Sequence, residues 1–364
     1  MSSQLASRLV RSTIGRRRYC FSMQRGWLLF EVLGGQPVLI AQGERLRKFI
    51  PADVFLQRNA AQETILEIIK RAVDRAEPVR ELLPGGRRAV HGVPVIMTDG
   101  VAHGVHIWTG PAAATPPPRA LPGAIKWDLT TGMAADCPQA LLNAGKDPAV
   151  EPTNGRSFAA DMPVSTINSS EAGVLALAVN RNAGDTFCAT WDLVDHRGQS
   201  IRAAFASRVR KEMQSSRAEH LVCRAMNWRV TAAPIRQADG DLARSIVRGT
   251  ARHGAHRALL DLGTWHLLKW LDSPSPDFDW QRHDPSRPLI HPDDAPIVEA
   301  MSAGFAVGPA SAVLRLRNRN GGWRAIHLTL QRLEIAPGTV VGLVTTRLAM
   351  RGGPSANPDQ ASDQ

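Results

Sequence analysis

One arrangement of short apolar runs recurs three times along the chain and constrains its fold more than any other feature. Each of three segments opens with strand-like runs and a turn, continues with helical periodicity, and closes with runs in which apolar and polar side chains alternate. Alternation with a period of two indicates strands with one buried and one solvated face. The sequence therefore predicts an α+β fold of three consecutive domains, each an antiparallel sheet with helices on one face.

The opening runs are arranged around turn-forming residues. They are 27–33 and 38–42 around Gly34-Gly35, 124–129 before Thr131-Gly132, and 258–262 and 265–271 around Gly263-Thr264. Only two residues separate the last pair of runs. We therefore expect a tight antiparallel hairpin at that position.

The closing runs are longer and alternate more clearly. They are 89–97 and 101–109 in the first segment, 186–194, 200–209 and 220–230 in the second, and 311–316, 323–335 and 339–348 in the third. The alternation is plainest in the run Ile326-His327-Leu328-Thr329-Leu330-Gln331. We expect its isoleucine and leucines to face a core and the other three side chains to face water.

Helices are predicted between the opening and closing strands. Asn59 followed by Gln62 resembles a capping box, and the apolar stripe that follows predicts one amphipathic helix over 60–76. In the third segment, Asp293 can cap a helix over 294–303.

Proline content and composition divide the chain further. Five prolines between residues 111 and 122 favour an extended linker, because proline fixes the backbone and lacks an N–H donor. The predicted division is a basic arm at 1–25, an N-terminal domain at 26–110, the linker at 111–122, a central domain at 123–234, a connecting helix at 235–254, a C-terminal domain at 255–350 and a disordered tail at 351–364.

The positive charge of the chain is concentrated at its beginning. The 44 basic and 33 acidic residues give a net charge of +11, and residues 1–25 contain six Arg and no acid. The remainder therefore carries 38 − 33, or +5, so we expect no nucleic-acid partner. The arm is expected to be disordered or not translated, with translation starting at Met23; a basic targeting peptide is the alternative.

Motifs for catalysis and for metal or cofactor binding are absent from the sequence. The cysteines (Cys20, Cys137, Cys188 and Cys223) form no C-x-x-C pair, which argues against a zinc site. No phosphate-binding glycine loop, nucleophile elbow or H-E-x-x-H motif is present. No run of apolar residues approaches the length needed to span a membrane. We expect a cytoplasmic, non-enzymatic protein without metal or cofactor.

Five residues are candidates for lining a ligand pocket: Trp127, Trp191, Trp265, His291 and Arg315. The tryptophans lie in or beside predicted strands, where a large ring can line a cavity or simply pack in the core. His291 can contact a ligand or belong to the start of the predicted helix. Arg315 can bind an anion or form part of a solvated strand face.

At these residues the third segment resembles a PAS sensor domain. The run IHPDDA at 290–295 begins a short helix, and a long three-stranded meander follows it. The second segment is similar at KWDLTTG (126–132) and in the run that begins FCATWDLV at residue 187, and could be a GAF or a PAS domain. Over 26–351 the chain resembles the actinobacterial, chiefly mycobacterial, triple-sensor proteins with tandem PAS, GAF and PAS domains.

This resemblance implies a sensory or signalling protein that lacks an output domain. Such a protein would bind an unknown small molecule or protein partner and act through a separate effector. Two alternatives stay open: an enzyme with an unrecognised site, and a purely structural scaffold. A homodimer is compatible with the sequence, and no membrane contact is expected.

Overall fold

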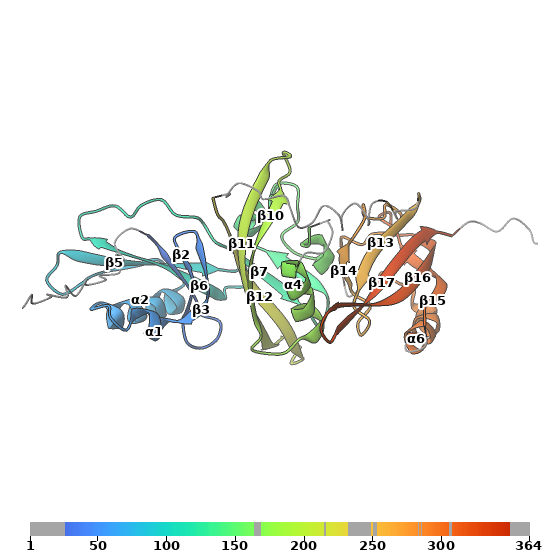
Figure 1. The fold of residues 1–364 in the computed structure, drawn as a ribbon, viewed down its shortest axis with the longest axis horizontal. Coiled ribbons are helices and arrows are strands. Elements are labelled where there is room, and N and C mark those ends of the chain that lie inside the picture. The colour runs from blue at the N-terminus through green and yellow to red at the C-terminus, as the bar shows by residue number, and fades with distance from the viewer. Residues whose placement is uncertain are drawn as a thin grey trace, which may run out of the picture.

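The computed structural model describes residues 26–163, 169–214, 216–231, 249, 253–282, 284, 286–305 and 308–349. Within them, three antiparallel sheets follow one another along the long axis of the molecule (Figure 1). The predicted arm, the predicted tail and nearly all of the predicted connecting helix lie outside the described residues. Each domain has few helices, so the molecule is mostly sheet and the α+β class holds only loosely.

The N-terminal domain is a six-stranded sheet with helices on one face. Its strand order is β3-β2-β1-β6-β5-β4. Helix α2 buries Ile65, Ile68 and Ala72 against the sheet, as the predicted stripe requires. The elements are β1 (Leu28–Glu31), β2 (Val38–Gln42), β3 (Arg45–Pro51), α1 (Ala52–Leu56), α2 (Gln62–Arg75), β4 (Val79–Leu82), β5 (Arg88–Ile96) and β6 (Ala102–Pro111).

The middle domain repeats this order in a second six-stranded sheet. Its strands lie in the order β10-β11-β12-β7-β8-β9. Its elements are β7 (Gly123–Asp128), β8 (Met133–Asp136), α3 (Pro138–Asn143), β9 (Arg156–Ser157), the 3-10 turn η1 (Phe158–Ala160), α4 (Ser169–Asn180), β10 (Thr186–Val194), β11 (Ser200–Met213) and β12 (Glu219–Arg229).

The C-terminal domain is a five-stranded sheet in the order β14-β13-β17-β16-β15. Its elements are β13 (Ala255–Leu260), β14 (Leu267–Trp270), the 3-10 turn η2 (Pro292–Asp294), α6 (Ala295–Gly304), β15 (Ala310–Arg317), β16 (Trp323–Ala336) and β17 (Thr339–Leu348). In all three domains the first strand pairs with the last, and the helices lie between the opening and closing strands. The predicted pattern of hairpin, helix and meander is confirmed at this level.

The three domains pack as one continuous series of layers. The face of the N-terminal sheet opposite α2 packs Leu29 and Ile40 against Met226 and Trp228 of the middle sheet. The other face of the middle sheet packs on α4, and α4 also contacts strands β16 and β17 of the C-terminal sheet. Helix α6 covers the far face of that last sheet. The order is therefore helix, sheet, sheet, helix, sheet, helix.

Helix α4 suits its place between two sheets because it is apolar on almost every side. Every residue from Ala172 to Val179 is apolar, and Val174, Leu175, Leu177 and Ala178 are buried. A helix that is apolar all round is stable only when it is covered all round. A methyl group at Gly173 would overlap the ring of Phe187 on β10, so glycine permits the close approach of α4 to its own sheet.

Two predicted helix caps and one predicted turn are wrong. Helix α2 has no side-chain cap. The side-chain oxygen of Asn59 instead accepts a hydrogen bond from the N–H of Ala61, before the helix begins at Gln62. The first turn of the HPDD helix is capped by the imidazole of His291, which accepts from the N–H of Asp293, so Asp293 is not the cap. Residues 261–266 form a loop rather than a two-residue turn, closed by the hydrogen bond from Trp265 N to Asp261 O.

The proline-rich segment between β6 and β7 contains no helix or strand and packs back on the N-terminal domain. The indole N–H of Trp27 donates to the carbonyl oxygen of Pro117 at 2.8 Å. The guanidinium of Arg119 lies 4.6 Å from the centroid of the Trp27 ring and donates to Nδ1 of His106. Burial, and secondarily the charge of Arg119, lower the pKa of His106 to about 3.

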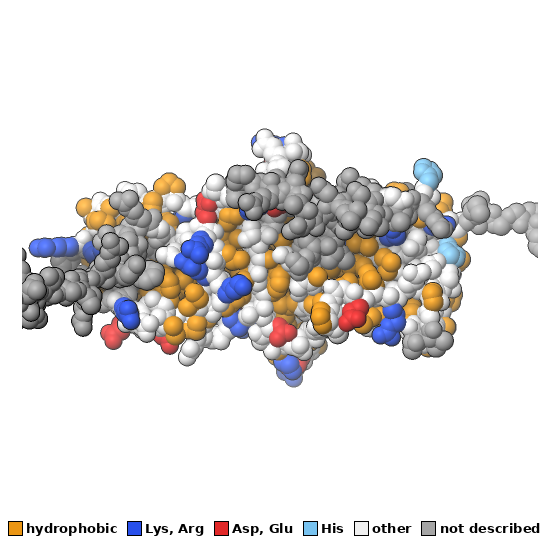
Figure 2. Space-filling view, viewed as in Figure 1, with side chains coloured by type: hydrophobic (Ala, Val, Ile, Leu, Met, Phe, Trp, Pro, Cys, Tyr) orange, Lys and Arg blue, Asp and Glu red, His pale blue; other side chains and the backbone are white. Residues whose placement is uncertain are grey.

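None of the described helices is both long and apolar enough to cross a membrane. On the face shown in Figure 2, the Lys and Arg side chains lie singly or in small groups, with hydrophobic and acidic side chains among them.

Candidate binding groove

Two of the five predicted site residues fill the core of the middle domain. The rings of Trp127 on β7 and Trp191 on β10 both stack against the ring of Phe205 on β11, with centroid distances of 5.4 and 5.3 Å. Phe158 meets Trp127 edge to face at 4.9 Å. Both indoles are buried, so their place in the structure is that of core packing.

Trp127 also reaches a cluster of buried charges. Its indole N–H donates to Oδ2 of Asp161 at 2.7 Å, and Lys146 lies 3.0 Å from Oδ1. Arg156 forms ion pairs with Asp161 and with Asp136. Burial opposes ionisation of Asp161, but the Lys146 and Arg156 charges outweigh it and lower its pKa. The cluster anchors η1, since all of its charges are paired.

The other three predicted site residues lie in the C-terminal domain and do not converge on a cavity. Trp265 packs against Phe305 at 5.9 Å. His291 caps the HPDD turn and contacts the ring of Trp323 at 4.6 Å. Arg315 holds Asp294 through two charge-assisted hydrogen bonds of 3.0 and 2.6 Å, which, opposed by burial, lower the pKa of that carboxyl.

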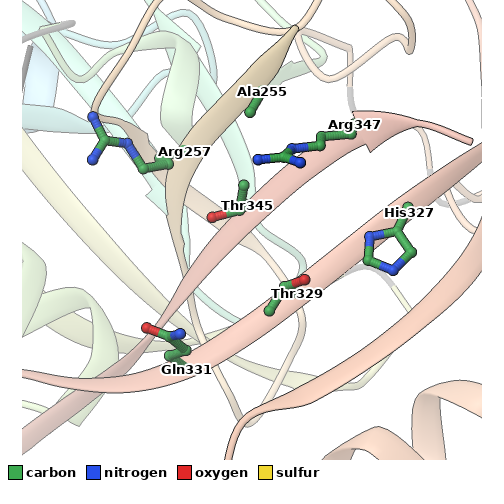
Figure 3. Close-up of a pocket in the computed structure, with 7 residues that line it drawn as sticks. All are labelled: Ala255, Arg257, His327, Thr329, Gln331, Thr345 and Arg347. Carbon is green, nitrogen blue, oxygen red and sulfur yellow. The ribbon is translucent and has the colours of Figure 1, made fainter. Parts of the chain in front are cut away.

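A polar groove lies on the outer face of the C-terminal sheet, the face turned away from α6. It encloses about 330 Å³ and draws its walls and floor from strands β13, β16 and β17 (Figure 3). The lining residues are Ala255, Arg257, His327, Thr329, Gln331, Thr345 and Arg347.

Strand register explains why these side chains meet. Directly paired residues on neighbouring antiparallel strands project to the same face. One row across the sheet is Ala255, Arg347, His327 and Val313, and the next is Arg257, Thr345, Thr329 and Ser311. The groove is therefore built mainly by side chains of these two rows, with Gln331 added from the next row, and without any special loop.

In the next row Gln331 still lines the groove, whereas Leu259 and Leu343 belong to the contact with the middle domain. Leu259 pairs with Leu343, and both pack in the cluster that contains α4. Leu343 lies two residues from Thr345, which lines the groove. One sheet face thus carries both the groove and the junction between the middle and C-terminal domains.

The two arginines of the groove differ in their partners. Arg257 is bound to Asp272 on one side of the groove, with hydrogen bonds of 2.7 and 2.9 Å. These bonds raise the pKa of Arg257 against the opposing effect of burial. Arg347 is exposed, and among the described residues no side chain or backbone group forms a hydrogen bond or ion pair with its guanidinium. No acidic side chain is among the lining residues.

A serine and a histidine lie at one border of the groove. Ser311 Oγ is 3.0 Å from Nε2 of His327 and also donates to the carbonyl oxygen of Leu328. Hydrolases use such a pair when a carboxylate orients the imidazole. In the part of the chain that the structure describes, no carboxylate bonds to His327. The same part contains no group of three or more His, Cys, Asp or Glu side chains that could hold a metal ion.

Buried ions also connect the domains. Arg224 on β12 donates to both carboxylate oxygens of Glu212 and to Asp99 of the N-terminal domain, at 2.6 to 3.2 Å. Lys269 on β14 lies 3.4 Å from Glu171 of α4 and donates to the carbonyl oxygen of Pro163. Each junction therefore contains a buried cation of one domain held by an acid of the next.

The sequence predicted part of the groove. Alternation along 323–335 placed His327, Thr329 and Gln331 on the solvated face, and they lie there. Arg347 and Arg257 were missed as site residues, although each stands at an alternating position of its strand. The missing information was strand register, which a single sequence does not contain.

Comparison with known proteins identifies the family domain by domain. Residues 26–118 match the Rv3651-like N-terminal domain, 121–230 the Rv3651-like middle domain and 240–355 the Rv3651-like C-terminal domain. A crystal structure of a protein from Mycobacterium tuberculosis is 42% identical, with a TM-score of 0.81, and the alignment covers 89% of this chain and 96% of that one. No curated protein matches the chain.

Sensory proteins align far less closely. A sensory box histidine kinase/response regulator from Burkholderia thailandensis is 17% identical, with 35% of this chain and 88% of that one covered and a TM-score of 0.21. An RNA-binding light-oxygen-voltage receptor is 9% identical, with 62% and 94% covered and a TM-score of 0.22. Scores this low carry no argument, so the assignment of the domains as PAS, GAF and PAS stays a prediction. The three domain matches and the mycobacterial structure show that the chain belongs to the Rv3651-like family of three-domain proteins.

Proposed function

We propose that this chain is a sensory or signalling protein without enzymatic activity, which binds a small molecule at its C-terminal sheet and acts through a separate protein in the cytoplasm. Its three domains would be PAS- and GAF-like. The observation that carries the proposal is the shared face of the C-terminal sheet. The rows that line the groove are followed directly by the row that packs on α4.

This arrangement gives a bound molecule a short route to the junction. A molecule that draws the groove strands together acts on Thr345, and Leu343 on the same strand belongs to the α4 contact. A ligand shifts a conformational equilibrium only by the difference in its affinity for the two states. Here the two states would differ in how tightly the C-terminal sheet covers α4, and the effector would bind one of them.

The test combines ligand screening with hydrogen exchange on the full chain. A metabolite panel is screened by thermal shift, and each hit is then followed by hydrogen–deuterium exchange of the α4 peptides. We expect a hit to raise the melting temperature and to change amide protection in both β17 and α4. Hits that protect only β17 would contradict the proposed transmission. The absence of any hit, together with no partner in pull-downs, would contradict sensing itself.

A second candidate, a scaffold that binds only proteins, is favoured by the filled domain cores. Trp127, Phe158 and Phe205 occupy the middle core, and Trp270 and Trp280 meet edge to face in the C-terminal core at 5.5 Å. A scaffold would capture the same partner with and without every metabolite of the panel. A sensor would capture it in only one of these conditions.

A further inference from the structure

We infer that the groove binds the anionic group of a small molecule, a carboxylate or a phosphate, with Arg347 as its principal contact. This inference rests on the proposed function and names the ligand class of the same site. Three of the seven lining side chains are Arg or His and none is acidic. The local field therefore favours an anion.

Arg347 is the group that is free to bind. The guanidinium of Arg257 already holds Asp272 in two hydrogen bonds. In contrast, the guanidinium of Arg347 extends across the groove toward Ala255 and Thr345, as Figure 3 shows. A guanidinium presents a planar set of N–H donors that matches a carboxylate or phosphate in two parallel hydrogen bonds.

The surroundings of Arg347 complete a site for an oxyanion and its polar substituents. Thr329 and Thr345 contribute hydroxyl groups, and Gln331 contributes an amide at the far end of the same face (Figure 3). Hydroxyl and amide groups can donate to the remaining anion oxygens or bond a hydroxyl of the ligand. The volume of about 330 Å³ is at the lower end for small-molecule sites, so the ligand is small.

A nucleic acid suits the groove poorly. Proteins that bind single strands combine several cations along a track with aromatic rings on which bases stack. No aromatic ring other than the imidazole of His327 is among the lining residues, and one of the two arginines is already neutralised by Asp272. One unpaired guanidinium on an open sheet face fits one anionic group.

The experiment is calorimetric titration of the full chain at low ionic strength with inorganic phosphate, with succinate and with the neutral succinamide. The variant is Arg347→Gln. Its matched control is Arg332→Gln, because Arg332 is also exposed but lies on β16 next to Gln331 and therefore on the opposite face. Both variants lose the same charge, so only their position differs.

We expect phosphate or succinate to bind the wild type and Arg332→Gln alike, and succinamide to bind neither. Arg347→Gln should weaken binding about 10-fold or more, as expected for losing a charge-assisted pair of hydrogen bonds. The stronger of the two anions identifies the ligand as a phosphate or a carboxylate. The inference would be overturned if Arg347→Gln bound the anions as tightly as the wild type, or if neither anion bound the wild type at concentrations up to about 50 mM.

Failure of this inference and failure of the proposed function give different results. Anion binding that depends on Arg347 but leaves α4 exchange unchanged supports the groove and contradicts sensing. A neutral metabolite that changes α4 exchange supports sensing and contradicts the anion site. An anion-dependent shift from monomer to dimer, measured by light scattering and retained in Arg347→Gln, would place the bound anion at a contact between two copies and overturn the inference.

Discussion

The two junctions of the molecule hold neighbouring domains together in different ways. The N-terminal and middle domains meet sheet to sheet, and the charges at that junction remain within reach of water, since the Asp99 side chain is 32% exposed. The middle and C-terminal domains share helix α4, and their ion pair is sealed, with Lys269 at 0% and Glu171 at 3%. The stability of the first junction should therefore depend on pH, whereas the second junction should be weakened mainly when one of its charged residues is replaced.

The largest effect is expected when the sealed ion pair is broken. Lys269→Met leaves the Glu171 carboxylate buried without its ammonium, which costs about 3 to 5 kcal/mol of unfolding free energy. The double variant Lys269→Met with Glu171→Leu should recover most of the loss, because it removes both charges. Urea unfolding followed by tryptophan fluorescence measures both. A loss below about 1 kcal/mol in the single variant would mean that the pair is not sealed.

Breaking the charged contact of the first junction should cost less. Arg224→Met removes charge-assisted hydrogen bonds to Glu212 and Asp99, and the freed carboxylates can be hydrated. We expect a loss of about 2 to 3 kcal/mol in the same urea titration. A loss equal to that of Lys269→Met would show that the two junctions are sealed alike.

Acid should weaken the first junction through His103, whose ring bonds Ala225 O and Arg224 of the middle domain. Burial, together with the charge of Arg224, lowers the pKa of His103 from 6.5 to about 4, although the hydrogen bond to Ala225 O and the charges of Asp99 and Glu212 act in the opposite direction. The unfolded chain takes up this proton below pH 6.5 and the folded chain only near pH 4. The stabilisation is therefore complete above 6.5 and decreases as the pH falls toward 4.

At pH 5 this difference amounts to about 2 kcal/mol. His103→Gln should show a smaller loss of stability between pH 7 and pH 5 than the wild type, by about that amount. His106, whose pKa is also lowered, contributes equally to both proteins and cancels in the comparison. If the stability of the two proteins changed in parallel with pH, protonation of His103 would not weaken this junction.

Asp99 acts at lower pH than the histidine. Burial opposes its ionisation, but hydrogen bonds and the charge of Arg224 lower its pKa to about 2. A depressed carboxyl pKa stabilises the fold above the ordinary value near 4, and this contribution is lost as the pH falls through 2. The two groups thus weaken the same junction in successive pH ranges.

The smallest effect is expected far from both junctions. Arg202 holds Asp192 in two hydrogen bonds of 2.6 and 2.8 Å between β10 and β11, a geometry much like that of Arg224, but on the surface. Arg202→Met should change the unfolding free energy by about 0 to 1 kcal/mol. If Arg202→Met lost as much unfolding free energy as Arg224→Met, the stabilisation by such pairs would depend on their geometry rather than on their burial.

Sequence patterns predicted the closing strands and α2 but missed helix α4 and strand β3, for different reasons. The closing strands and α2 were found because polar and apolar side chains alternate with the period of the element. Helix α4 was missed because it has no polar side to create a period. Strand β3 was missed because an edge strand rich in Arg and Lys shows little buried pattern. The groove depends on register among three strands, which only the folded chain defines.

Helix α4 also sets the order in which the protein can be completed during synthesis. It ends at residue 180, and strand β16, which covers it, begins at residue 323. The ribosome needs roughly 7 to 30 seconds to add the intervening residues at about 5 to 20 residues per second. During this time the outer side of α4 lacks the strands of the C-terminal sheet that cover it, although its own domain is complete once β12 ends at residue 229. The nascent middle domain therefore presents a helix-sized apolar surface to chaperones until the last meander emerges.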